Sequence, residues 1–256
     1  MRFSTFLYHS NKPATLGWVG TDSEERFTSH NLKKLTKQER DTLAYYDNHP
    51  ITYKVNAEGF RDVSLQHKPK EVDVFLGCSH TFGVGLHKQH LWTTKLADYN
   101  KFPSINAGIP GSGVMTQFRV IKYLLDRFKV RKVYHYSILE HVRYEWFSGQ
   151  NFITTGLFEL NVKSVDTYSP LCHEENLALQ KYVYYNAIEN LCINAGAEYY
   201  PFTDEVLGIY IPENEEFEDK NLLARDLAHH SVSKHHQIYK NCITFNKNTF
   251  RKLHTI

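Results

Sequence analysis

The sequence predicts a three-layer α/β/α sandwich built around a mostly parallel β-sheet. From Glu71 onward, short apolar runs of strand length alternate with longer segments that carry apolar residues at helical spacing. The chain has 256 residues, which is enough for one medium-sized domain with a full hydrophobic core. Because parallel strands are buried on both faces, helices are expected to cover the sheet on both sides.

The first half of the chain supplies three strands and one helix. Residues 51–55 are strand-like, and residues 72–76 form a short apolar strand that ends at Gly77. Residues 87–99 carry apolar side chains at helical spacing and predict a helix. Residues 102–106 then form a second short apolar strand before a loop rich in glycine.

The second half continues the alternation. Residues 114–128 predict an amphipathic helix, and residues 132–139 predict the strand that follows it. A long helix at residues 174–195 and a strand at residues 198–202 follow a loop or hairpin at residues 151–170. The chain then passes through an acidic loop (211–220) and a closing helix (231–243).

Composition narrows the class of protein. The formal net charge is +2, and basic residues do not gather on one segment, so a nucleic-acid partner is not expected. The first 50 residues are polar and irregular, and we interpret them as an N-terminal extension of a domain that spans residues 51–256. We see no signal peptide or membrane-spanning run, so we expect a soluble cytoplasmic protein with no membrane partner. A zinc ribbon or a dense disulfide framework is not expected, because the four cysteines are widely spaced: Cys78, Cys172, Cys192 and Cys242.

The segment Gly77–Gly85 carries a candidate nucleophile. It follows the first apolar strand directly, so Ser79 is expected at the carboxyl edge of the sheet, where ligands bind in such folds. The flanking glycines permit a tight turn, and backbone N–H groups there can face a developing anion. A turn of small residues after a strand is also a common structural feature without chemistry. A phosphate-binding loop is not indicated, because the pattern G-x-x-x-x-G-K-[ST] is absent.

A second candidate group lies near the C-terminus, in the sequence Arg225–His230. A serine nucleophile needs a base to remove its proton, and the base needs an acceptor that fixes its tautomer. Asp226 precedes His229 by three residues, a spacing that places both side chains on one side of a turn. Together with Ser79, this pair has the composition of a catalytic triad.

Three segments in this order resemble the SGNH/GDSL hydrolase superfamily. Gly77-Cys78-Ser79 resembles the family's first block, with Cys78 where Asp is common, and residues 56–62 resemble a stretch often found just upstream. Residues 106–111 resemble the second block, in which Gly111 matches the oxyanion-hole glycine, and Asp226 with His229 matches the last block. The resemblance implies an SGNH/flavodoxin-like fold with Ser79 as nucleophile.

At the third block, this sequence departs from the usual pattern of the family. An Asn whose amide binds the oxyanion is expected after the third strand, but Glu140 or His141 stands there. We expect His141, or else Arg143, to supply the missing donor, and Arg143 could instead hold an acidic substrate. Some phage-encoded members similarly combine Gly-Cys-Ser with an Arg after this strand, so the departure is consistent with a subgroup of that kind.

Other functional interpretations carry less weight. A histidine-rich stretch could suggest a metal site, but adjacent pairs point in different directions and no further ligand completes a tetrahedron. Cys78 could itself be a nucleophile, although Ser79 holds the family position. Aromatic residues after the third strand line a substrate cleft or anchor a loop. The histidines concerned are His229, His230, His235 and His236, and the aromatic residues are Tyr144, Trp146 and Phe147.

The resemblance implies a serine esterase that uses an acyl-enzyme mechanism. The expected substrate is a carboxylic ester of a small molecule or a carbohydrate, and no metal or organic cofactor is expected. Two alternatives stay open: acyl transfer to a sugar or another alcohol at the same site, and a non-catalytic binding or structural module that kept the fold. Nothing in the sequence indicates the acyl length or the oligomeric state.

Overall fold

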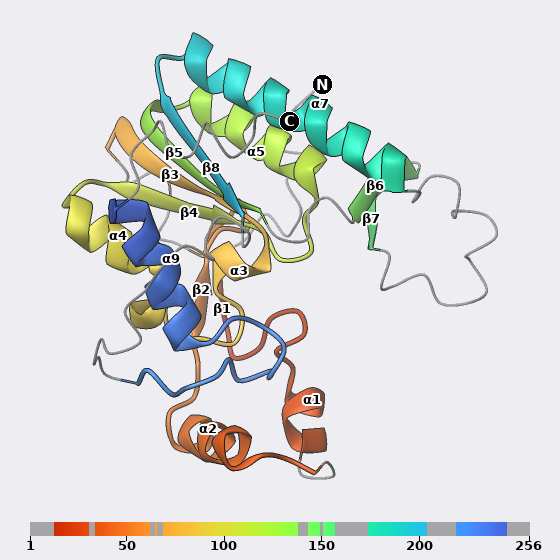
Figure 1. Ribbon diagram of the computed structural model, residues 1–256, viewed down its shortest axis with the longest axis vertical. Helices are drawn as coiled ribbons and strands as arrows, with labels where there is room; N and C mark the ends of the chain where they lie inside the picture. The colour runs from red at the N-terminus through yellow and green to blue at the C-terminus, as the bar shows by residue number, and fades with distance from the viewer. Residues whose placement is uncertain are drawn as a thin grey trace.

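A four-stranded parallel sheet forms the centre of the structure (Figure 1). The structure is a computed structural model, and it describes residues 13–30, 34–61, 65, 69–137, 143–148, 151–156, 174–203 and 219–244. The strands of the sheet are β3 (Glu71–Gly77), β4 (Ser104–Gly108), β5 (Lys129–Ser137) and β8 (Glu198–Thr203).

The order of the strands creates a switch point next to β3. The sheet has the order β4-β3-β5-β8, so the chain leaves β3 for β4 on one side and then crosses over to β5 on the other. Gly77, the last residue of β3, is in register with Gly108 of β4 and with Tyr136 of β5. In sheets of this flavodoxin-like order, ligands bind outside the carboxyl ends of the strands at the switch point. The residues that follow Gly77 therefore lie where a site is expected.

Helices cover both faces of the sheet (Figure 1). On one face α5 (Val114–Leu125) packs against α7 (Glu174–Asn194), and on the other α4 (Trp92–Asn100) packs against α9 (Val232–Thr244). The predicted three-layer α/β/α sandwich with a parallel sheet is thereby confirmed. Both faces of β3 are buried, which explains its nearly continuous apolar sequence.

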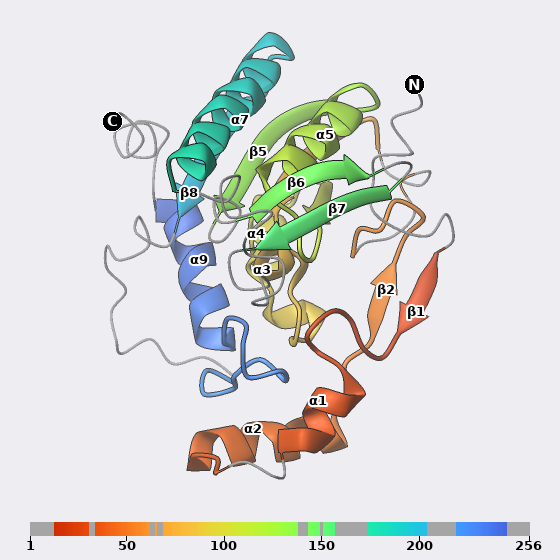
Figure 2. The same cartoon turned by 90° about the vertical axis from the view of Figure 1, so that its right-hand side faces the viewer.

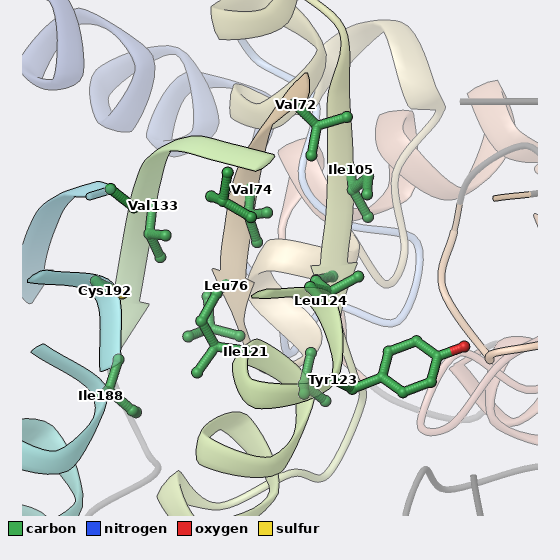
Figure 3. Close-up of a cluster of buried hydrophobic side chains, with 14 of the residues drawn as sticks. Val72, Val74, Leu76, Ile105, Ile121, Tyr123, Leu124, Val133, Ile188 and Cys192 are labelled. Atoms are coloured by element: carbon green, nitrogen blue, oxygen red, sulfur yellow. The ribbon is translucent and has the colours of Figure 1, made fainter. Parts of the chain in front are cut away.

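The core under α5 and α7 consists mainly of aliphatic side chains, with a few aromatic rings such as that of Tyr123 at its edge (Figure 3). Val72, Val74 and Leu76 alternate along β3 and point to this side, and each is completely buried. The opposite core, under α4 and α9, is mainly aromatic: Phe75, Trp92, Tyr134, Tyr136 and Phe202 belong to it. The alternation of side chains along the strands therefore separates two cores of different composition.

The N-terminal part of the chain contains regular structure beyond the carboxyl edge of the sheet (Figure 2). Its elements are β1 (Ala14–Leu16), α1 (Glu24–Ser29) and α2 (Lys37–Asn48). The expectation of an irregular extension is wrong here, because Thr36 and Glu39 form a capping box that starts α2. Strand β1 pairs antiparallel with β2 (Tyr53–Val55), across the predicted boundary at residue 50. The boundary itself stays a prediction.

Several element ends differ from the sequence prediction. Helix α4 begins at Trp92 rather than at residue 87, because a short 3₁₀ turn, η4 (Lys88–His90), and an extended Leu91 precede it. Strand β4 lies two residues further along the chain than predicted. The Pro103 carbonyl, just before it, accepts from the Asp73 N–H of β3 at 2.8 Å.

A β-hairpin follows β5 in the chain. It consists of β6 (Arg143–Ser148) and β7 (Asn151–Gly156), so it begins before the predicted loop or hairpin at residues 151–170. Residues 157–173 and most of the predicted acidic loop lie outside the described residues. Among the helices that the structure describes, none has the length and apolar character needed to cross a membrane.

Candidate active site

Ser79 lies on a tight turn at the end of β3. It opens the short helix α3 (Ser79–Phe82) and is 5% exposed. A Cβ on Gly77 would lie 2.1 Å from Thr81 Oγ1 and 2.6 Å from the Tyr136 carbonyl oxygen, so the turn requires glycine at that position. Gly83 ends α3 in the left-handed conformation, at φ 86°, and its N–H donates to the Ser79 carbonyl at 2.8 Å. The Ser79 N–H is the first of α3 and has no partner within the helix.

The second block packs directly on this turn. The Asn106 side-chain amide donates to the Thr81 carbonyl at 2.9 Å, and a Cβ on Gly108 would lie 2.3 Å from the Phe82 nitrogen. Gly111, further along the same loop, is exposed and has φ 77°, where glycine is favoured. In the described part of the chain, no atom lies within 4 Å of where its Cβ would be, so the loop leaves open space at this point.

Arg61 secures the same turn from the other side. Its buried guanidinium donates to the carbonyls of Phe82 and Gly83, and to that of Leu86 at 2.7 Å. It also lies over the Tyr53 ring, 4.5 Å from the centroid, and burial lowers the pKa of Arg61 to about 10. Arg61 belongs to the upstream stretch at residues 56–62, for which the sequence indicated no role. Its hydrogen bonds hold the chain that follows Ser79.

Asp226 and His229 form a short hydrogen bond. His229 Nδ1 lies 2.6 Å from Asp226 Oδ2, while the N–H groups of Ala228 and His229 each donate to Oδ1 at 3.1 Å. Burial alone would raise the pKa of Asp226, but the hydrogen bond and charge of His229, with Thr21 and Ala228, lower it to about 2. An ionised carboxylate can only accept, so Nδ1 carries the proton and Nε2 is left free to act as a base.

Gly85 joins the Ser79 turn to the segment that carries Asp226 and His229. The Arg225 N–H donates to the Gly85 carbonyl at 2.8 Å. A Cβ on Gly85 would lie 2.8 Å from the Ala224 Cβ and 3.2 Å from Asp226 Oδ1. The first and last blocks are therefore in direct contact, although they lie far apart in the sequence.

The Ser79 hydroxyl and His229 are not hydrogen-bonded to each other. Among the described residues, Ser79 Oγ contacts Cys78 Sγ, at 3.9 Å. His80, the residue after the nucleophile, packs its ring 4.8 Å from that of His229 and 4.1 Å from that of His230, between centroids. Burial, and then the neighbouring histidines, hold the pKa of His80 far below its usual range. The His229 ring is therefore packed against a neutral ring.

The hairpin strand β6 holds the loop that carries Gly111. Arg143 Nη1 donates to the Ser112 carbonyl at 2.9 Å. Buried Glu145 accepts from the Gly113 N–H at 2.9 Å and from the Thr116 N–H at 2.6 Å, at the start of α5. Of the predicted oxyanion residues, Gly111 lies on this loop, and Arg143 lies on the strand that holds the loop. His141 and Glu140 lie outside the described residues.

The histidines raised as metal ligands have other neighbours in the structure. His235 Nδ1 accepts from the Trp92 N–H at 3.2 Å, and His230 Nε2 lies 2.8 Å from the Tyr136 hydroxyl. In the part of the chain that the structure describes, no group of three or more His, Cys, Asp or Glu residues could hold a metal ion.

A buried ion pair behind Asp226 was not indicated by the sequence. Arg225 Nε donates to Asp22 Oδ1 at 2.8 Å, and Arg225 Nη2 donates to Asp22 Oδ2 at 2.6 Å. The Tyr53 hydroxyl also donates to Asp22 Oδ2 and accepts from the Gly85 N–H at 2.8 Å. The sequence does not identify Asp22 and Arg225 as partners, because the two residues are 203 positions apart in the chain.

Comparison with known proteins yields a structural match of low similarity. No family model matches the chain, and no curated protein matches it. Among solved structures, the chain is similar to a protein from Desulfitobacterium hafniense DCB-2 that is assigned to the lipolytic G-D-S-L family, with a TM-score of 0.34 and 10% sequence identity. The match covers 71% of this chain and 99% of that chain. The roles of individual residues therefore rest on the geometry of this chain.

Proposed function

We propose that the chain is a serine esterase of the SGNH/GDSL type, which hydrolyses a carboxylic ester of a small molecule or a carbohydrate. One observation carries the proposal. The Asp226–His229 pair is joined, through Gly85, to the turn that presents Ser79 at the switch point of the sheet. Acyl transfer requires a base with a fixed tautomer that can reach a serine on a strand-end turn, and these contacts bring the segments that carry the two groups together.

The mechanism uses groups of this chain. His229 Nε2 takes the proton of Ser79 Oγ, which attacks the ester carbonyl. The N–H groups of Ser79 and Gly111 receive the oxyanion, and Asp226 stabilises the protonated imidazole. His229 then gives its proton to the leaving alcohol, and water repeats the sequence on the acyl-enzyme. Cleavage of the acyl-enzyme returns Ser79 Oγ and His229 to their starting protonation states.

The first step requires Ser79 Oγ to turn away from Cys78 and toward His229. Rotation about χ1 moves a serine hydroxyl between staggered positions without a change in the backbone. Catalytic hydrogen bonds are often long in enzymes without substrate and shorten in the complex. A bound substrate favours this rotation, because the rotated Ser79 Oγ then contacts the ester carbonyl that it attacks.

The third oxyanion donor is proposed to come from the residues after β5. Arg143 is held near the Gly111 loop through the Ser112 carbonyl, and its charge acts on His80, the neighbour of Ser79. His141 precedes it in the chain by two residues. A side chain from this segment replaces the Asn of the family, and loss of such a donor typically lowers kcat about 10²- to 10³-fold.

A serine-reactive fluorophosphonate tests the proposal directly. The full chain is expected to gain one label, detected by intact-mass spectrometry and mapped to Ser79, and to hydrolyse a chromogenic acetate ester. Ser79→Ala should abolish both results. Cys78→Ala should keep the label, which distinguishes the serine from its neighbouring thiol. Ser29→Ala, which removes a hydroxyl bonded within α1, is the matched control. Absence of label in the wild-type chain would refute the enzyme and favour a non-catalytic module that kept the fold.

Acyl transfer is the second candidate function. The observation that favours it is the burial of Ser79, which is 5% exposed, because a shielded acyl-enzyme can favour a bound alcohol over water. Product analysis in the presence of candidate sugars or other alcohols distinguishes the two reactions. A transferase yields a new ester, whereas a hydrolase yields the free acid whatever acceptor is added.

A further inference from the structure

One hydroxyl group from the N-terminal part of the chain contacts both members of the acid–base pair. Thr21 lies between β1 and α1, and its Oγ1 donates to Asp226 Oδ2 at 2.6 Å. The same carboxylate oxygen accepts from His229 Nδ1, also at 2.6 Å. Thr21 Oγ1 is itself 3.4 Å from His229 Nδ1. Since the Thr21 proton is given to Asp226, both oxygens near Nδ1 are acceptors, which favours the tautomer with the proton on Nδ1.

Thr21 donates one of the four hydrogen bonds that the Asp226 carboxylate accepts. Two backbone N–H groups, of Ala228 and His229, donate to Oδ1, and Thr21 with the His229 ring donates to Oδ2. A carboxylate offers two oxygens with several acceptor sites, so all four bonds can form at once. Rotation of the Asp226 side chain breaks at least one of them. The plane of the carboxylate, and with it the direction of the imidazole, is therefore fixed partly by Thr21.

The segment 17–22 is itself anchored at both ends. Asp22, next to Thr21, forms the buried ion pair with Arg225, whose side chain is 3% exposed. At the other end, the Arg225 guanidinium donates to the Gly17 carbonyl at 2.6 Å and lies over the Trp18 ring, 3.7 Å from the centroid. These contacts hold the Thr21 hydroxyl beside Asp226, which follows Arg225 directly in the chain.

We propose that Thr21 is a positioning residue for the reaction of Ser79, and that residues 17–22 are a working part of the active site. The inference rests on the proposed function. Thr21 acts through Asp226 in two ways: its hydrogen bond holds the carboxylate in plane with the His229 ring, and it takes up part of the negative charge. Both effects depend on the hydroxyl group and neither on the methyl group of the side chain.

Removal of the hydroxyl has a consequence that lost packing alone does not have. In Thr21→Val, Asp226 keeps more of its negative charge available to His229, which favours the protonated imidazole. The other titratable and charged groups around His229 do not change: His80 packs against it, His230 and His235 lie behind, and Arg143 acts on His80. The midpoint of the pH–rate profile should rise by about half a unit or more, and the plateau rate should fall about 10-fold.

The test is the rate at which a fluorophosphonate labels Ser79, measured from pH 5 to pH 9 in the full chain. Thr21→Val is compared with Thr21→Ser, which restores the hydroxyl, and with the wild type. Thr15→Val is the matched control, because Thr15 is exposed on the nearby strand β1, where valine is well tolerated. Thr21→Val is expected to shift the midpoint and lower the plateau, while Thr21→Ser and Thr15→Val are expected to match the wild type.

The outcomes separate the two proposals. Labelling of the wild type with no change in Thr21→Val overturns the role of Thr21 and leaves the serine esterase intact. A Thr21→Ser variant that behaves like Thr21→Val also overturns it, because the methyl group and not the hydroxyl would then matter. A wild-type chain that is never labelled overturns the proposed function, and the role of Thr21 falls with it. If thermal melting shows that Thr21→Val does not fold, Thr21→Ala provides the same comparison.

Discussion

The two halves of the proposed site are held by different forces. Ser79 follows β3, whose alternate side chains enter an aliphatic core on one side and an aromatic core on the other. Asp226 and His229 lie instead on a turn held by a hydroxyl group and a buried ion pair from residues 17–22. Apolar packing tolerates changes of salt and pH, whereas hydrogen bonds between buried ionised groups depend on every partner being present. The Ser79 turn therefore follows a strand that is held by apolar packing, and Arg61 and Asn106 bond to it as well. The Asp226–His229 turn depends on polar contacts with residues 17–22.

The largest expected effect comes from neutralising the acid–base half. Asp226→Asn removes the charge that stabilises protonated His229 and lets the imidazole adopt the wrong tautomer. Turnover of an acetate ester should fall about 10⁴-fold, as it does when the Asp of an established Ser-His-Asp triad is replaced by Asn. Asp126→Asn, at an exposed carboxylate paired with Lys122, is the control and should keep full activity. Activity that survives in Asp226→Asn would contradict the triad.

The next effect is on stability. Asp22→Ala leaves the buried Arg225 guanidinium without its carboxylate, and the free energy of unfolding should fall by about 3–5 kcal/mol. The exposed Lys122–Asp126 pair is the comparison, since its loss in Asp126→Asn should cost only about 0.3–0.5 kcal/mol. Urea unfolding followed by circular dichroism measures both. Equal losses in the two variants would show that the ion pair does not hold the acid–base half.

A change in the apolar half should cost stability without affecting the chemistry of the base. Leu76 is fully buried next to Gly77, and Leu76→Ala should lower the free energy of unfolding by about 2–5 kcal/mol through the cavity it leaves. Its pH–rate profile should keep the wild-type midpoint, in contrast to Thr21→Val. Leu179→Ala, at a side chain that is 60% exposed, should change stability by less than about 0.5 kcal/mol.

The smallest effect concerns acid sensitivity. Burial lowers the pKa of His80 far below its ordinary value of 6.5, so the folded protein keeps it neutral while the unfolded chain binds a proton below that pH. The lowered pKa does not change stability above pH 6.5, where His80 is neutral in both states. Below pH 6.5 it lowers the free energy of unfolding by up to about 1.4 kcal/mol per pH unit. His80→Phe should reduce the loss of stability between pH 7.5 and pH 5.5. An unchanged slope in urea unfolding would contradict a neutral His80.

The sequence predicted the fold because strand and helix periodicities alternate clearly after Glu71. Its errors lie where local packing overrides periodicity. Leu91 looks helical by its spacing, yet it is extended and completes a 3₁₀ turn before α4. In the N-terminal part, the pattern Thr36-x-x-Glu39 is a readable capping signal that the polar composition obscured.

Of the candidate site, the sequence predicted only the residues that lie in short motifs. Ser79, Asp226 and His229 lie in short patterns with chemical meaning, and the structure brings their segments together through Gly85. Thr21 could not be found in this way. A lone threonine has no signature, and its partner Asp226 is adjacent only in the folded chain. Residues that position other residues are set by tertiary contacts, which a single sequence does not reveal.

The Thr21–Asp226 hydrogen bond can form only late in the synthesis of the chain. Its partners are 205 residues apart in the sequence. On a ribosome that adds about 5–20 residues per second, roughly 10–40 s separate their synthesis. Strands β3, β4 and β5 and their helices emerge in this interval and can already pair, whereas Asp22 and Thr21 still lack their partners Arg225 and Asp226. The proposed site is therefore expected to close last, after the sheet, when Arg225 and Asp226 leave the ribosome.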